Sequence, residues 1–171
     1  MRTVFGFGDE FRFGWVKVTA PRGAVGFASN TDVAQGGSTL ASGISRPESN
    51  FMLGYIVSLP PWWTGLTLVN PGMTTAVVDL FAIAPDGSLI GGADDTPTAH
   101  VSIPPNGKTS RLLIEWIPKT QSLSSDGGFI FVRSSVPLYA LALSFTRDLH
   151  ILSDIPEFDL PPAAYDPPRP R

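Results

Sequence analysis

Two adjacent tryptophans, Trp62 and Trp63, are the side chains of this 171-residue chain best suited to binding a small ligand. Each indole offers a large apolar face and one N–H donor, so a pair at a corner of the chain can stack on a sugar ring. No cluster of Asp, Asn or Arg accompanies the pair in the sequence to hydrogen-bond sugar hydroxyls. We therefore favour a packing role, with one ring on the core and the other against a neighbour. Carbohydrate binding through Trp62 and Trp63 is the alternative.

The remaining reactive side chains form no familiar catalytic or metal-binding arrangement. His100 and His150 fall in separate segments without matched ligand spacing, and Asp94-Asp95 is a single acidic pair. Calcium takes about six to eight oxygen ligands, so one pair does not make a site. The sequence has no nucleophile elbow, phosphate-binding loop or zinc-protease motif, and it has no cysteine. We expect no catalytic residue, no metal site and no cofactor, and hence a protein that is not an enzyme.

The composition favours a protein whose surface is partly covered by partners. Hydrophobic residues make up 43% of the chain and charged residues only 16%, which allows a core but leaves few charges for the surface. The net charge is −3, the pI is near 5.2, and no basic stripe occurs, so nucleic acid is not an expected partner. No apolar run approaches the roughly 20 residues of a membrane span.

The N-terminal segment from Val4 to Val18 is predicted to be a strand with an aromatic stripe. Its odd positions are rich in rings, which a period of two places on one face, while the even positions carry glycines and charges. Such a strand fits a core position in its own sandwich or a groove on a neighbouring subunit, and the stripe alone does not separate the two. The residues predicted for a subunit interface here are Val4, Phe5, Phe7, Phe11, Phe13 and Trp15.

Part of the chain repeats. The segment Gly14–Ile44 echoes Gly128–Ile155, with Val25 and Phe27 in the phase of Leu141 and Leu143. Both blocks are predicted to be hairpins. The long segment that precedes the second block has no counterpart before the first, so the first block lacks partners for its strands. This incompleteness favours exchange of segments between subunits.

Short apolar runs separated by Gly, Pro and Asn turns predict an all-β fold, an antiparallel immunoglobulin-like β-sandwich. We divide the chain into an N-terminal strand and partial-module hairpin (1–50), a β-sandwich module (51–156) and a Pro-rich tail (157–171). A single helical turn is expected near Leu113–Ile117. The predicted strands of the module cover Phe51–Ser58, Leu66–Val69, Thr74–Ala84, His100–Ile103, Lys108–Leu112, Phe129–Val132 and Leu138–Phe145.

The tail is predicted to dock on another subunit as extended polyproline II, with Tyr165 as its apolar anchor. An ordered Pro-rich segment needs external contacts to offset its chain entropy. The tail residues assigned to this interface are Pro161, Pro162, Tyr165, Pro167 and Pro168.

Four motifs resemble a repeated immunoglobulin-like β-sandwich module of bacterial secreted and surface proteins. They are the run from Trp62 to Gly72, Ala84-Pro85-Asp86-Gly87, Pro104-Pro105-Asn106-Gly107-Lys108 and Pro137-Leu138-Tyr139-Ala140-Leu141. The aromatic N-terminal strand and the Pro-rich tail are similar to the exchanged ends of pilus-type fibre subunits. The resemblance implies an extracellular or cell-surface, modular, non-enzymatic protein. We expect a structural subunit of an extracellular bacterial fibre that binds copies of itself head to tail by exchange of terminal segments. Glycans are the partner class under the alternative.

Overall fold

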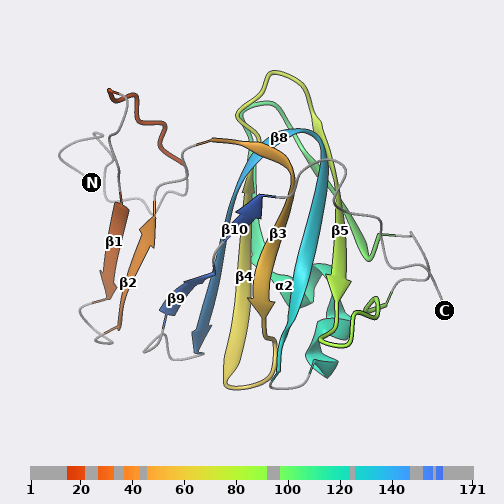
Figure 1. Cartoon of the computed structure of the whole chain (residues 1–171). Coiled ribbons are helices and arrows are strands. Elements are labelled where there is room, and N and C mark those ends of the chain that lie inside the picture. Colours follow the sequence, from red (N-terminus) through yellow and green to blue (C-terminus); the bar gives the residue numbers. More distant parts are fainter. Residues whose placement is uncertain are drawn as a thin grey trace.

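The computed structural model describes residues 15–21, 27–32, 37–42, 46–91, 97–123, 126–146, 152–155 and 157–159. In this part of the chain the protein is mostly β, with antiparallel strands in a curled sheet, as the sequence predicts (Figure 1). Its helical segments are short: α2 (Leu113–Trp116) and a 3₁₀ helix, η1 (Pro118–Ser122). None of the described helices is long and apolar enough to cross a bilayer.

The strands follow the turn signals closely. Asn-Pro-Gly, Pro-Asp-Gly and Pro-Pro-Asn-Gly each lie between two of them, as such sequences should. The strands are β1 (Phe27–Asp32), β2 (Gly37–Ser42), β3 (Glu48–Ile56), β4 (Trp62–Val69), β5 (Ala76–Ile83), β6 (Ala99–Ile103), β7 (Lys108–Leu112), β8 (Gly128–Thr146), β9 (Leu152–Ile155) and β10 (Glu157–Asp159).

The long strand β8 joins two half-sheets. Its first half pairs with β3 and β5, which gives the order β10-β3-β8-β5-β6. Its second half pairs with β4 and β9, which gives the order β9-β8-β4-β7. Buried side chains from both half-sheets form one apolar core, so the curl brings their inner faces together. Fully burying one such side chain contributes about 1.5–3 kcal/mol.

The prediction that residues 129–132 and 138–145 form a hairpin is wrong. Both segments belong to the single 19-residue strand β8. The pairing with β3 shifts between Asn50↔Arg133 and Glu48↔Leu138, so an irregularity takes the place of a turn. Pro137 lies within it, and an irregular stretch is where a strand tolerates a residue without an N–H group.

The two faces of β8 carry side chains of different size. Ala140 and Ala142 are buried in the core, where their small size lets the opposite half-sheet approach closely. Leu141, Leu143 and Phe145 alternate with them and remain partly exposed. The small-residue face of β8 is therefore the one that packs against another layer.

The predicted N-terminal strand does not extend through residues 15–21, which form no strand. Val16 and Val18 are 56% and 78% exposed. Without a partner on either side, their β-branched side chains do not by themselves hold a strand in a sheet. Residues 4–14, with Val4, Phe5, Phe7, Phe11 and Phe13, lie outside the described residues.

The repeat takes a different form from the one predicted. β1 and β2 make one antiparallel pair, with Phe27 opposite Ser42. The end of β8 and β9 make another, with Leu143 opposite Asp154. The sequence alignment matches Phe27 to Leu143 and Ser42 to Ser153. Phe27 pairs with Ser42, but Leu143 pairs with Asp154 rather than with Ser153, so the registers of the two strand pairs differ by one residue. Val25 and the side chain of Phe27 lie outside the part of the chain that the structure describes.

The C-terminal segment begins by completing the first half-sheet. β10 pairs antiparallel with β3, with Asp159 opposite Phe51, so the first three residues assigned to the tail form an edge strand. Residues 160–171, with Pro161, Pro162, Tyr165, Pro167 and Pro168, lie outside the described residues. Their docking on another subunit stays a prediction.

Candidate functional site: the outer face of the β4–β7–β8 half-sheet

Thr64, at the start of the recognised motif, has a structural role. Its buried hydroxyl donates to the carbonyl of Val57 at 2.7 Å and accepts from the N–H of Val57 at 3.0 Å. These two bonds tie the segment after β3 to β4 across the corner at Pro60-Pro61. A threonine can do this because its hydroxyl both donates and accepts.

Asn70 fastens two turns together and is fully buried. Its Nδ2 donates to the carbonyls of Thr74 at 2.8 Å, Ile103 at 3.1 Å and Pro104 at 3.2 Å. Its Oδ1 accepts from the N–H of Gly72 at 2.9 Å. One side chain therefore connects the β4–β5 turn to the β6–β7 turn, and the Asn-Pro-Gly motif specifies architecture rather than a ligand site.

The tryptophans do not share a face. Trp62 lies opposite Thr146, which is 8% exposed, whereas Trp63 lies opposite Phe145. Successive residues of a strand project to opposite sides, so the two rings cannot form one continuous platform. Trp63 is the one placed on the partly exposed outer side, and both rings are partly buried.

The outer face is the solvent-facing side of β4, β7 and the second half of β8. The residues it brings together are Trp63, Gly65 and Thr67 of β4, Ser110 of β7, and Leu141, Leu143 and Phe145 of β8. At Gly65 an added Cβ would lie 3.1 Å from Cε1 of Phe145. The missing side chain leaves room for the ring to lie across β4.

A shallow groove of about 250 Å³ crosses this face. Its lining is mainly apolar, and it consists of Gly65, Leu66, Thr67, Ser110, Arg111, Leu141, Leu143 and Phe145. The hydroxyls of Thr67 and Ser110 lie 2.8 Å apart and satisfy each other. Arg111, on the edge strand, is exposed. The groove suits an apolar or aromatic side chain and contains no nucleophile next to a base.

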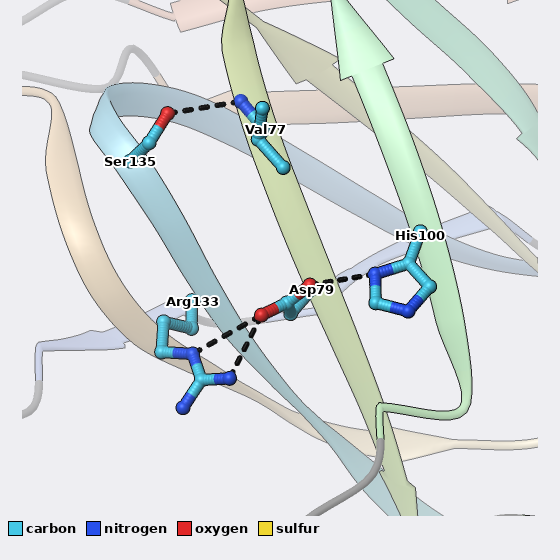
Figure 2. Close-up of polar contacts among 5 residues, drawn as sticks. All are labelled: Val77, Asp79, His100, Arg133 and Ser135. Carbon is cyan, nitrogen blue, oxygen red and sulfur yellow. Dashed lines mark hydrogen bonds and ion pairs between the residues drawn. The ribbon is translucent and has the colours of Figure 1, made fainter.

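A second group of polar side chains lies on the outer face of the other half-sheet (Figure 2). Asp79 of β5 stands opposite His100 of β6 and Arg133 of β8. Its Oδ1 lies 2.8 Å from Nδ1 of His100, and its Oδ2 accepts from Nε and Nη2 of Arg133 at 3.2 and 2.8 Å. The guanidinium also lies 5.1 Å from the centre of the Phe81 ring.

This polar row joins three strands and is not a catalytic arrangement. A histidine beside a carboxylate could act as a base, but the Ser135 hydroxyl accepts from the Val77 N–H at 2.9 Å and lies away from His100 (Figure 2). Such exposed pairs contribute about 0.2–1 kcal/mol each. Within the described residues, no group of three His, Cys, Asp or Glu side chains could hold a metal. The sequence did not reveal the row, because it depends on the register between strands.

Of the residues predicted for a subunit interface, Trp15 is the one that lies within the described part of the chain. Its indole N–H donates to the carbonyl of Asn106 at 3.3 Å, a contact within one chain. Asn106 lies in the turn that leads directly into β7. The aromatic N-terminal segment therefore ends beside the edge of the half-sheet that carries the groove.

Comparison with known proteins adds little to this description. No family model and no curated protein sequence matches the chain. Among solved structures, the chain is similar to the Anabaena sensory rhodopsin transducer, with 17% sequence identity and a TM-score of 0.40 over 57% of this chain and 97% of that one. This similarity is too low to transfer a function.

Proposed function

We propose that this chain is a non-enzymatic, self-assembling subunit of an extracellular bacterial fibre, with an immunoglobulin-like module that polymerises by exchange of terminal segments. The observation that carries the proposal is the outer face, where Trp63, Leu141, Leu143 and Phe145 remain partly exposed around an apolar groove. Apolar side chains that stay partly exposed around a groove offer apolar area that a partner could bury. The aromatic N-terminal segment supplies side chains that match the groove in character.

Strand exchange supports such an assembly because it combines two kinds of contact. Main-chain hydrogen bonds give affinity, and alternate side chains that enter pockets give specificity. The fibre and its extracellular location come from the resemblance of the motifs to secreted modules.

The test places a charge in the groove. Leu143→Asp should abolish or strongly reduce assembly, since a carboxylate would have to enter an apolar contact unpaired. Met73→Asp is the matched control, because Met73 is an apolar residue that is 80% exposed in the β4–β5 turn. Sedimentation velocity across a concentration series measures assembly, and circular dichroism checks that both variants fold.

Wild-type chain that remains monomeric at high concentration would refute self-assembly. Equal loss of assembly in Leu143→Asp and Met73→Asp would show that charge, rather than the groove, is responsible.

Carbohydrate binding is the second candidate, favoured by the position of Trp63 beside Phe145 on the outer face. A sugar ring could stack on the partly exposed Trp63 of this face. Titration of the wild type and Trp63→Ala with a soluble β-glucan oligosaccharide, followed by calorimetry, distinguishes the two. Saturable heat that Trp63→Ala removes, from a protein that stays monomeric, would favour the carbohydrate site over the fibre.

A further inference from the structure

The turn between β6 and β7 contains the dipeptide Asn106-Gly107. Asn106 is the one asparagine of the chain that a glycine follows, since Asn30, Asn50 and Asn70 precede threonine, phenylalanine and proline. Its side chain is exposed.

The shape of the turn requires this pair of residues. The φ angle of Asn106 is 54°, a left-handed conformation that asparagine tolerates better than most residues with a side chain. A Cβ on Gly107 would lie 2.8 Å from the carbonyl oxygen of Pro104, so no side chain fits there without a shift of the main chain. The turn therefore combines an exposed asparagine with a following residue that has no side chain.

An asparagine that a glycine follows can lose its side-chain amide without an enzyme. The main-chain nitrogen of the glycine, once deprotonated, attacks Cγ of the asparagine, a succinimide ring closes, and ammonia leaves. Water then opens the ring at either carbonyl, which gives aspartate or isoaspartate. Water is consumed and ammonia is released, and no oxidant or cofactor takes part. A side chain on the following residue hinders the attack, and a following proline has no N–H to lose.

In the closed turn the attacking nitrogen is already engaged. The N–H of Gly107 donates to the carbonyl of Pro104 at 2.9 Å. On either side of it, the N–H of Asn106 donates to the carbonyl of Gly72 at 3.1 Å, and the carbonyl of Gly107 accepts from the N–H of Asn70 at 2.9 Å. These bonds hold the Gly107 nitrogen in place and keep its proton on it.

Further contacts hold the asparagine itself. The side-chain amide of Asn106 donates to Sδ of Met73 at 3.5 Å, and its main-chain carbonyl accepts from the Trp15 indole at 3.3 Å. The Asn70 side chain fastens the start of the turn through the carbonyls of Ile103 and Pro104. Cγ of Asn106 and the next main-chain nitrogen meet only after some of these bonds open, and a local opening costs less free energy than global unfolding.

We propose that Asn106 is a site of spontaneous deamidation, and that opening of the β6–β7 turn, which Asn70 and Trp15 oppose, sets its rate. The inference does not depend on the proposed function, because it needs neither a partner nor assembly.

Deamidation changes both the charge and the geometry of the turn. Each event replaces a neutral amide by a carboxylate, which makes the net charge of −3 more negative by one unit. Isoaspartate also adds a methylene to the main chain, which displaces the Gly107 carbonyl from the N–H of Asn70. The modified turn should therefore open more readily, and the connection between the β4–β5 and β6–β7 turns should weaken.

Incubation at mildly alkaline pH, followed by peptide mass spectrometry, measures the conversion of Asn106. The product has the mass of an acid in place of an amide and elutes as two peptides, one with aspartate and one with isoaspartate. The wild type unfolded in guanidinium chloride should convert at least about tenfold faster than the folded chain, because unfolding frees the Gly107 nitrogen. Asn50 is the internal control, because the phenylalanine after it should keep its conversion slow in both states.

Variants test the contacts that keep the turn closed. Asn70→Ala in native buffer should convert Asn106 about tenfold faster than the wild type. Asn50→Ala, the matched control on β3, should leave the rate at Asn106 unchanged. Trp15→Phe removes the indole donor and keeps an aromatic ring, so the loss of one exposed hydrogen bond should raise the rate about twofold. Asn106→Gly keeps the left-handed turn and should abolish the mass change.

Absence of conversion at Asn106 in denaturant would overturn the site. Equal rates for the folded and the unfolded wild type would overturn control by the turn. A wild-type rate in Asn70→Ala that is folded by circular dichroism would overturn the role of Asn70. If Asn70→Ala does not fold, Trp15→Phe decides, and a wild-type rate in that variant would overturn the part of the proposal that concerns the closing contacts.

Discussion

Replacing Asn70 by alanine should destabilise the fold more than any other single polar substitution among the motif residues. The alanine removes two N–H donors and one carbonyl acceptor from a fully buried site. Three carbonyls, of Thr74, Ile103 and Pro104, and the N–H of Gly72 lose their partner.

The magnitude follows from these contacts. A typical intramolecular hydrogen bond contributes about 0.5–1.5 kcal/mol net. The three carbonyls share two N–H groups, so we count three independent bonds, one of them to Gly72. We therefore expect Asn70→Ala to lower the free energy of unfolding by about 3 kcal/mol. The change should lie in the urea midpoint, with the slope of the transition unchanged.

Asn50→Ala is the control for this measurement. Asn50 lies partly exposed on β3, where a surface substitution usually changes stability by no more than about 0.5 kcal/mol. Urea unfolding followed by tryptophan fluorescence compares the two variants. If Asn70→Ala costs less than about 1 kcal/mol, the turns do not depend on Asn70, and the structural reading of the Asn-Pro-Gly motif is wrong.

Four further outcomes are expected. Gly65→Ala should displace the Phe145 ring, because the new Cβ would lie 3.1 Å from it, and the change should appear as altered aromatic NMR shifts of Phe145. Asp79→Ala should cost only about 1 kcal/mol in urea unfolding, because the side chains that lose their partner, His100 and Arg133, are 67% and 49% exposed. The Ser88 hydroxyl and backbone N–H hold the pKa of Asp86 below its ordinary value, so any stabilisation from them is present above that value and is lost as pH falls; Ser88→Ala should raise this pKa, measured by NMR titration. Phe5→Asp/Phe7→Asp and deletion of Pro161–Arg171 should each weaken assembly in sedimentation while leaving the β fold intact, and wild-type polymer from either chain would count against exchange of that end.

The sequence predicts the strands well where turn chemistry is explicit. Asn70-Pro71-Gly72 and Pro85-Asp86-Gly87 separate β4, β5 and the segment before β6, and the one-turn helix near Leu113 is confirmed. Its first turn is closed by Glu115, whose carboxylate accepts from the N–H of Leu112 at 3.0 Å. These features depend on residues close together in the sequence, so local reasoning finds them.

The sequence fails where the outcome depends on distant partners. Pro137 reads as a turn, yet it lies within β8, because β5 pairs with the residues before it up to Ser134 and β4 pairs with those after it from Tyr139. The polar row of Asp79, His100 and Arg133 forms only in one register of three strands, which no local pattern specifies. The groove escapes prediction for the same reason: Gly65 and Phe145 lie far apart in the sequence and meet across β4 and β8.

In this chain, the residues that hold the fold together differ from those at the sheet edges and the groove. Thr64 and Asn70 serve the architecture, so the recognised motif preserves a scaffold. β10 covers the edge at β3, and β2 lies near β9. The edge strand β6 carries His100 of the polar row, and polar side chains on an edge strand disfavour pairing with another chain. Among the described strands, β7 is the one that lies beside the apolar groove and next to Asn106, whose carbonyl accepts from the Trp15 indole. Under the proposed function, a module that keeps its motif but changes Gly65 or Leu143 should therefore keep the fold and lose self-assembly.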